Sequence, residues 1–188
     1  MNFPIILTWT RVAMIPLLIM IYYLPIPWGE KDIYRDAIGT VFFVLAAITD
    51  WLDGWLARRL NQTSAFGAFL DPVADKLMVT AALIILLFLS RVDPIIAVII
   101  IGREITISAL REWMATLGAR SNVAVHWLGK VKTIVQMIAI PCLLYGHTIA
   151  GIDFKILGTV LIVLAAVLTI WSMCYYLKSA WPHLVNEK

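Results

Sequence analysis

Long apolar runs alternate along this chain with short segments that carry most of its charge. Three runs without a charged residue, 12–29, 133–152 and 156–177, approach or exceed the ~20 apolar residues that span a bilayer. Three other runs reach that length only when they include neighbouring charged residues. Those extended helices are expected over residues 37–60, 67–90 and 94–115. The pattern predicts six transmembrane helices, three of them charged at one end.

If successive helices alternate in direction, the charged ends of these helices all fall on one side of the membrane. Basic residues in short loops mark the cytoplasmic side. The opposite side holds only four of the 15 Lys and Arg residues, namely Lys31, Arg35, Arg91 and Lys155. The charged side is therefore predicted to be cytoplasmic, with both termini inside.

Composition excludes several classes of protein. The chain is 62% hydrophobic and 14% charged, whereas soluble domains carry about 25% charged residues, so neither a compact soluble monomer nor a disordered chain is expected. Its two cysteines lie in apolar runs and offer no disulfide framework. The net charge of +3 suits anionic lipid headgroups, and no nucleic-acid partner is expected because the basic residues adjoin membrane helices. We expect an all-α integral membrane protein with residues 1–188 in one domain and no cleavable signal.

Four aspartates flank the connection between the second and third predicted helices. At 3.6 residues per turn, Asp50 and Asp53 lie about 60° apart on one helix, and Asp71 and Asp75 are about one turn apart on the next. The connection at 61–66 is short, so we expect antiparallel neighbours whose four carboxylates converge. Such a cluster takes up protons unless cations neutralise it. Oxygen ligands of this kind suit two Mg²⁺ or Mn²⁺ ions that clamp a phosphoryl group.

Small residues and an arginine extend this candidate site. Gly54 and Ala57 share the aspartate face and leave space for a phosphorylated ligand, and Arg58 on the next turn suits a phosphate. Two other interpretations stay open at this point. The aspartates can be ordinary interfacial residues, or they can serve a cation transporter, although transporter sites tend to lie near the bilayer midplane.

Residues 50–75 read D-x2-D-G-x2-A-R-x8-G-x3-D-x3-D, which resembles the signature of the CDP-alcohol phosphotransferase family. The resemblance implies six transmembrane helices around a cytoplasm-facing polar cavity, usually in a homodimer. It also implies transfer of a substituted phosphoryl group from a CDP-linked donor to an alcohol, with release of CMP. The implied roles are metal binding by Asp50, Asp53, Asp71 and Asp75, contact with CDP by Asp50, Gly54, Ala57, Arg58 and Gly67, and general-base catalysis by Asp75.

A second group of charges on the same side bears on the acceptor alcohol. We interpret these residues as a second anion site, which a phosphorylated acceptor needs; alternatively they are snorkelling anchors or ion pairs such as Arg111 with Glu104. The candidates for binding the acceptor phosphate are Arg103, Arg111, Lys130, Lys132, Thr8 and Arg11.

Residues 103–114 and 121–136 also resemble the bacterial members of the family that use glycerol 3-phosphate. That resemblance implies a donor of CDP-diacylglycerol, a product of phosphatidylglycerophosphate and a place in the bacterial inner membrane. Cardiolipin synthase, or another family member with a different acceptor, is the alternative within the family.

Overall fold

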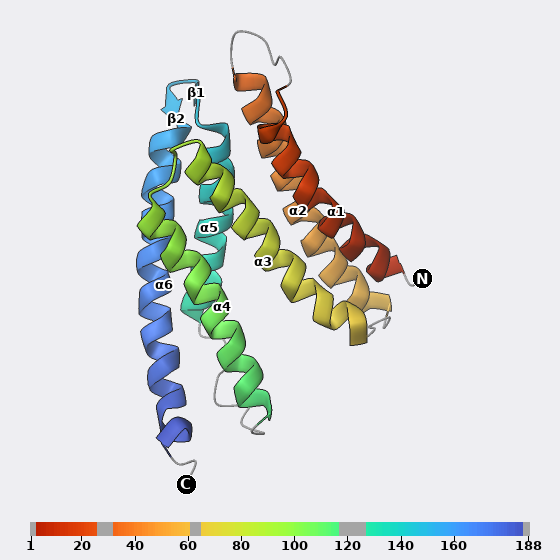
Figure 1. The fold of residues 1–188 in the computed structure, drawn as a ribbon, viewed down its shortest axis with the longest axis vertical. Helices are drawn as coiled ribbons and strands as arrows, with labels where there is room; N and C mark the ends of the chain where they lie inside the picture. Colours follow the sequence, from red (N-terminus) through yellow and green to blue (C-terminus); the bar gives the residue numbers. More distant parts are fainter. Residues whose placement is uncertain (1–2, 26–31, 61–64, 117–126, 186–188) are drawn as a thin grey trace.

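Six helices that alternate in direction form the computed structural model (Figure 1), which describes residues 3–25, 32–60, 65–116 and 127–185. The predicted number of helices is confirmed. Their bounds are α1 Phe3–Tyr23, α2 Ile33–Leu60, α3 Ala65–Phe88, α4 Pro94–Thr116, α5 Trp127–Tyr145 and α6 Phe154–Val185.

Two helices end earlier than the apolar runs predict. Helix α1 stops at Tyr23, close to Pro25, because a proline disfavours helical backbone in the residue before it. Helix α5 stops at Tyr145, and Gly146 follows with a φ of +61°, a left-handed conformation that glycine adopts without a steric penalty. The prediction that residues 133–152 form one continuous span is therefore wrong.

A short hairpin, which the hydrophobic pattern does not reveal, occupies the remainder of that run. Strand β1 (Thr148–Ile149) pairs with the antiparallel strand β2 (Ile152–Asp153). Between them Ala150 and Gly151 both have positive φ, which produces the tight turn. Asp153 then accepts hydrogen bonds from the first backbone amides of α6, so its carboxylate caps that helix.

The helices enclose charge and present apolar side chains outward. The core contains Leu18, Phe43, Leu86, Ile100 and Leu143, together with the buried polar residues Asp36, Arg103, Lys132, Gln136, Thr169 and Ser172. Many large apolar side chains on the outside are more than half exposed, among them Val41, Ile84, Ile95, Val98 and Val160. Soluble monomers rarely expose so much contiguous apolar surface, and this arrangement fits a surface in contact with lipid.

One stretch in the described part of the chain, Phe154–Cys174 of α6, is long and apolar enough by itself to cross a membrane. The apolar parts of α1 and α5 are shorter, at Val12–Tyr23 and Val131–Tyr145, because their helices end early. Helices α2, α3 and α4 include charged residues, as the sequence predicts.

The helix ends divide into two sets (Figure 1). The ends that begin α1, α3 and α5 and finish α2, α4 and α6 lie at one end of the bundle, here called the charged end. The β1–β2 hairpin and the turn between α3 and α4 lie at the opposite, far end. The predicted alternation is therefore present in the fold.

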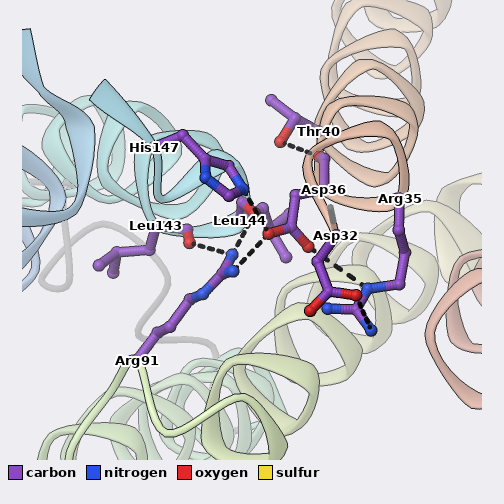
Figure 2. A network of polar contacts seen from close by, with 8 residues as sticks. All are labelled: Asp32, Arg35, Asp36, Thr40, Arg91, Leu143, Leu144 and His147. Carbon is purple, nitrogen blue, oxygen red and sulfur yellow. Dashed lines mark hydrogen bonds and ion pairs between the residues drawn. The ribbon is translucent and has the colours of Figure 1, made fainter. Parts of the chain in front are cut away.

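A buried polar network joins three segments at the far end (Figure 2). Asp36, at the start of α2, is fully buried and pairs with Arg91 from the α3–α4 turn. His147, just after α5, places its Nε2 3.0 Å from Asp36 Oδ2. Arg91 also donates to the backbone carbonyl of Leu143, 3.1 Å away, in the last turn of α5. The sequence marks Arg91 as a far-side residue but does not reveal that it is a central cross-link.

Candidate functional site

The structure describes the side chains of two of the four aspartates, and both are partly buried. Asp50 is in α2, and Asp75 is in α3. The side chain of Asp75 lines a small pocket, and Met137 of α5 closes one wall of it. The other lining residues are Phe43, Ala46, Ala47, Met78 and Val79. Because Ala46 is one turn before Asp50 on α2, this pocket lies close to the part of α2 that carries the aspartate pair.

An apolar cavity of about 230 Å³ adjoins this pocket. The two share Phe43, Ala47 and Met137, and the cavity continues along α2 past Val44 and Ile48. Its lining is apolar, whereas the Asp75 pocket contains a carboxylate. The polar site and an apolar cavity therefore lie next to each other between α2 and α5.

Several predicted site residues lie in segments whose side chains are outside the described residues. These are Asp53, Gly54, Ala57, Arg58, Gly67, Asp71, Thr8, Arg11, Arg111 and Lys130. Their backbones are helical. Among the residues that the structure describes, no three acidic, histidine or cysteine side chains gather into a metal-binding group. The convergence of all four carboxylates remains a prediction.

The described acceptor-phosphate candidates come together in the interior. Lys132 of α5 is fully buried and pairs with the carboxylate of Glu104 on α4. Arg103 is 6% exposed and places Nη1 3.3 Å from the same Glu104 oxygen. Two buried cations thus share one carboxylate. The resulting cluster has a net positive charge and lies near the middle of α4.

Helix α6 contributes to this cluster in a way that the sequence analysis missed. Nη2 of Arg103 donates to Ser172 Oγ at 3.4 Å, and Ser172 in turn donates to the backbone carbonyl of Thr169 at 2.9 Å. Ser172 and Thr169 are both buried. A signal for them was available, because they are hydrogen-bonding residues within an otherwise apolar helix, although threonine and serine also occur in such helices for purely local reasons.

Buried charges at mid-helix are costly, and they mark functional sites when they face the inside of a membrane bundle. Glu104 offsets part of the repulsion between Arg103 and Lys132, since each cation is within ion-pair distance of it. The group thus holds two cationic side chains that donate hydrogen bonds, as a site for an anion requires.

Comparison with known proteins identifies the group to which this chain is related. The profile of the CDP-alcohol phosphatidyltransferase family matches residues 1–171. The chain belongs to this family. Among curated relatives, a protein of Salmonella choleraesuis is 47% identical over 99% of this chain and 98% of its own, and one of Escherichia coli K12 is 46% identical over the same shares. Both carry the name CDP-diacylglycerol–glycerol-3-phosphate 3-phosphatidyltransferase.

Membership in the CDP-alcohol phosphatidyltransferase family confirms the resemblance that the aspartate signature indicates, and the family match includes all four aspartates. The described donors fit a hard divalent cation, because Asp50 of α2 and Asp75 of α3 supply carboxylate oxygens, the ligands that such ions prefer. The same match includes Arg103, Glu104 and Lys132, but it ends one residue before Ser172.

Proposed function

We propose that this protein transfers the phosphatidyl group of CDP-diacylglycerol to glycerol 3-phosphate, which yields phosphatidylglycerophosphate and CMP. The observation that carries the proposal is the 46–47% identity, along almost the whole of both chains, to relatives named for that activity. The buried pair of Arg103 and Lys132 supports it further, since a phosphorylated acceptor requires cationic ligands.

The acceptor phosphate binds at Arg103 and Lys132 in this proposal. Glu104 holds both cations in one place before the acceptor arrives, and the two cations bind the phosphate. Arg111, Lys130, Thr8 and Arg11 complete the predicted anion site. Arginine is suited to this task because its planar guanidinium donates two parallel hydrogen bonds to phosphate oxygens.

The donor binds beside the aspartates. Asp50, Asp53, Asp71 and Asp75 hold two Mg²⁺ or Mn²⁺ ions, and the CDP moiety contacts Asp50, Gly54, Ala57, Arg58 and Gly67. When bound, the ions polarise the phosphoryl oxygens and stabilise the leaving CMP. The cavity along Val44 and Ile48 extends the same site into an apolar environment, as a lipid donor requires.

Asp75 acts as the general base. A primary alcohol is a weak nucleophile, so a carboxylate within reach of its proton lowers the barrier to attack. The alcohol oxygen forms a bond to the phosphatidyl phosphorus, the bond from that phosphorus to CMP breaks, and the alcohol proton passes to Asp75. Holding the two reactants in line supplies much of the remaining acceleration.

The protein resides in the bacterial inner membrane with the charged end toward the cytoplasm, and residues 1–188 act as one transmembrane domain in a homodimer. Soluble CMP and glycerol 3-phosphate are handled on that side. The orientation rests on the distribution of basic residues, because only four of the 15, Lys31, Arg35, Arg91 and Lys155, are predicted on the far side.

Purified protein in detergent, supplied with CDP-diacylglycerol and one acceptor at a time, tests the proposal through release of CMP. We expect turnover with glycerol 3-phosphate and little with phosphatidylglycerol, serine or inositol phosphate. Turnover with phosphatidylglycerol alone would instead identify a cardiolipin synthase. If Asp71→Asn preserved CMP release but abolished cation flux into liposomes, the protein would be a transporter.

A matched pair of variants separates the proposed base from a general loss of charge. Asp75→Asn is expected to abolish turnover, because an amide cannot take the proton. Asp93→Asn is the control. Asp93 lies at the far end, just before α4, and its Oδ1 accepts a hydrogen bond of 2.8 Å from the backbone amide of Ile95. Asparagine caps a helix about as well as aspartate, so this variant should retain full activity. Equal activities in the two variants would contradict the role of Asp75.

A further inference from the structure

Two buried polar side chains beside the cation pair have atoms without a hydrogen-bond partner. Gln136 of α5 is 3% exposed and Thr169 of α6 is fully buried. Within the described part of the chain, neither Gln136 Oε1 nor Thr169 Oγ1 meets a donor or acceptor. Almost all buried polar atoms in proteins are paired, so two unpaired atoms at one site indicate a missing partner.

Helix geometry places both residues near Lys132. Gln136 is one turn beyond Lys132 on the same face of α5. Gly158 of α6 and Leu143 of α5 lie at the same height along the helix bundle, because a Cβ added to Gly158 would be 2.7 Å from Leu143 Cγ. Because α5 and α6 are antiparallel, moving about three turns from that contact along both helices brings Lys132 level with Thr169.

The other contacts of α6 lead to the second cation. Ser172 is one turn beyond Thr169; it donates to the Thr169 carbonyl and accepts a hydrogen bond from Arg103. The two unpaired atoms therefore adjoin the site that Arg103 and Lys132 form.

The chemistry of the two atoms selects the kind of partner. An amide oxygen only accepts, so Gln136 Oε1 requires a group that donates a proton, whereas a threonine hydroxyl either donates or accepts. A fully ionised phosphate offers acceptors only, and it leaves Gln136 Oε1 unpaired. An alcohol both donates and accepts, and so it satisfies the two side chains together.

We propose that Gln136 and Thr169 bind a neutral hydroxyl of the acceptor, next to the cations that bind its phosphate. The inference rests on the proposed function, in which glycerol 3-phosphate is the acceptor. Its primary hydroxyl attacks the donor, and the hydroxyl on the middle carbon remains for recognition. Gln136 and Thr169 are then specificity-determining residues, which distinguish a phosphorylated triol from a phosphorylated diol.

The test compares glycerol 3-phosphate with 3-hydroxypropyl phosphate, which lacks only the middle hydroxyl. Binding of each compound to the purified full-length protein is measured by calorimetric titration, which does not depend on turnover. The wild type should bind glycerol 3-phosphate about 10- to 100-fold more tightly, because a site that pairs with a hydroxyl is left unsatisfied by the deoxy compound. Thr169→Val and Gln136→Met should reduce this ratio to about threefold or less, with binding of 3-hydroxypropyl phosphate little changed.

Two further variants serve as controls. Thr159→Val removes an exposed hydroxyl from the same helix, one that bonds only to the carbonyl of Lys155, and should keep the wild-type ratio. Thr169→Ser retains the hydroxyl and should restore most of the ratio. If Thr169→Val and Gln136→Met weaken the binding of both compounds equally, the side chains hold a structural water and the proposal is wrong. The proposal is also wrong if the wild type binds the two compounds with nearly equal affinity. If the wild type keeps the expected affinity ratio but releases no CMP, the result counts against the proposed function alone.

Discussion

The far-end network offers a direct measure of what a buried ion pair contributes to this fold. Replacing Arg91 with methionine removes the main partner of Asp36, which is fully buried, and also removes donors to the backbone at the end of α5. The methionine side chain keeps much of the volume of arginine, so the loss is mainly electrostatic. Arg35, the other arginine of the network, provides the comparison.

The expected magnitude follows from burial. Breaking a buried pair by removing one partner costs about 3–5 kcal/mol, because an uncompensated charge stays inside. Asp36 keeps His147 and a longer contact of 3.5 Å to Arg35, which favours the lower part of that range. Arg35→Met is expected to cost at most about 1 kcal/mol, since its nearer partner, Asp32 at 3.3 Å, is 66% exposed and water screens the pair.

Thermal unfolding of the purified protein in detergent is the assay. For a chain of this length, 3 kcal/mol corresponds to a fall in Tm of roughly 6–12 °C. The double variant Asp36→Leu with Arg91→Met should recover much of that loss, because it leaves no uncompensated carboxylate. Activity below the transition should be unchanged, as the network lies at the far end, whereas Asp75 lies in the half of α3 nearer the charged end. Equal Tm shifts in Arg91→Met and Arg35→Met would refute the reasoning.

Five other variants probe the cation cluster, the helix contacts and the cap of α6. Glu104→Gln should raise the KM for glycerol 3-phosphate about tenfold and leave that for CDP-diacylglycerol unchanged, because Arg103 and Lys132 lose the carboxylate that holds them in place. Glu104→Asp should restore part of the affinity. Gly158→Ala should lower Tm, because the added Cβ would lie 2.7 Å from Leu143 Cγ. Gly102→Ala is the control: its Cβ would meet nothing within 4 Å, so the variant should gain up to about 1 kcal/mol of stability from the higher helix propensity of alanine. Asp153→Ala should cost about 1 kcal/mol through loss of the α6 cap, measured by the same unfolding assay.

The helices and the type of chemistry follow from local sequence. A run of about 20 apolar residues has few alternatives to a membrane helix, because lipid cannot satisfy exposed backbone groups. The spacing of Asp50, Asp53, Asp71 and Asp75 follows helical periodicity, so the family signature is readable without coordinates. Helix ends are harder to predict: the left-handed Gly146 that ends α5 lies inside an uninterrupted apolar run.

The sequence by itself determined the six helices, the charged end to which the aspartates belong, and the family. Only the tertiary structure decided which ionic and hydrogen-bonding partners the buried charges have. Asp36 pairs with Arg91 and His147, and Arg103 with Ser172, across separations of 55 to 111 residues. Periodicity reports which residues of one helix share a face, whereas a partner on another helix depends on how the helices pack. The cost of burying an unpaired charge then makes those few pairings specific.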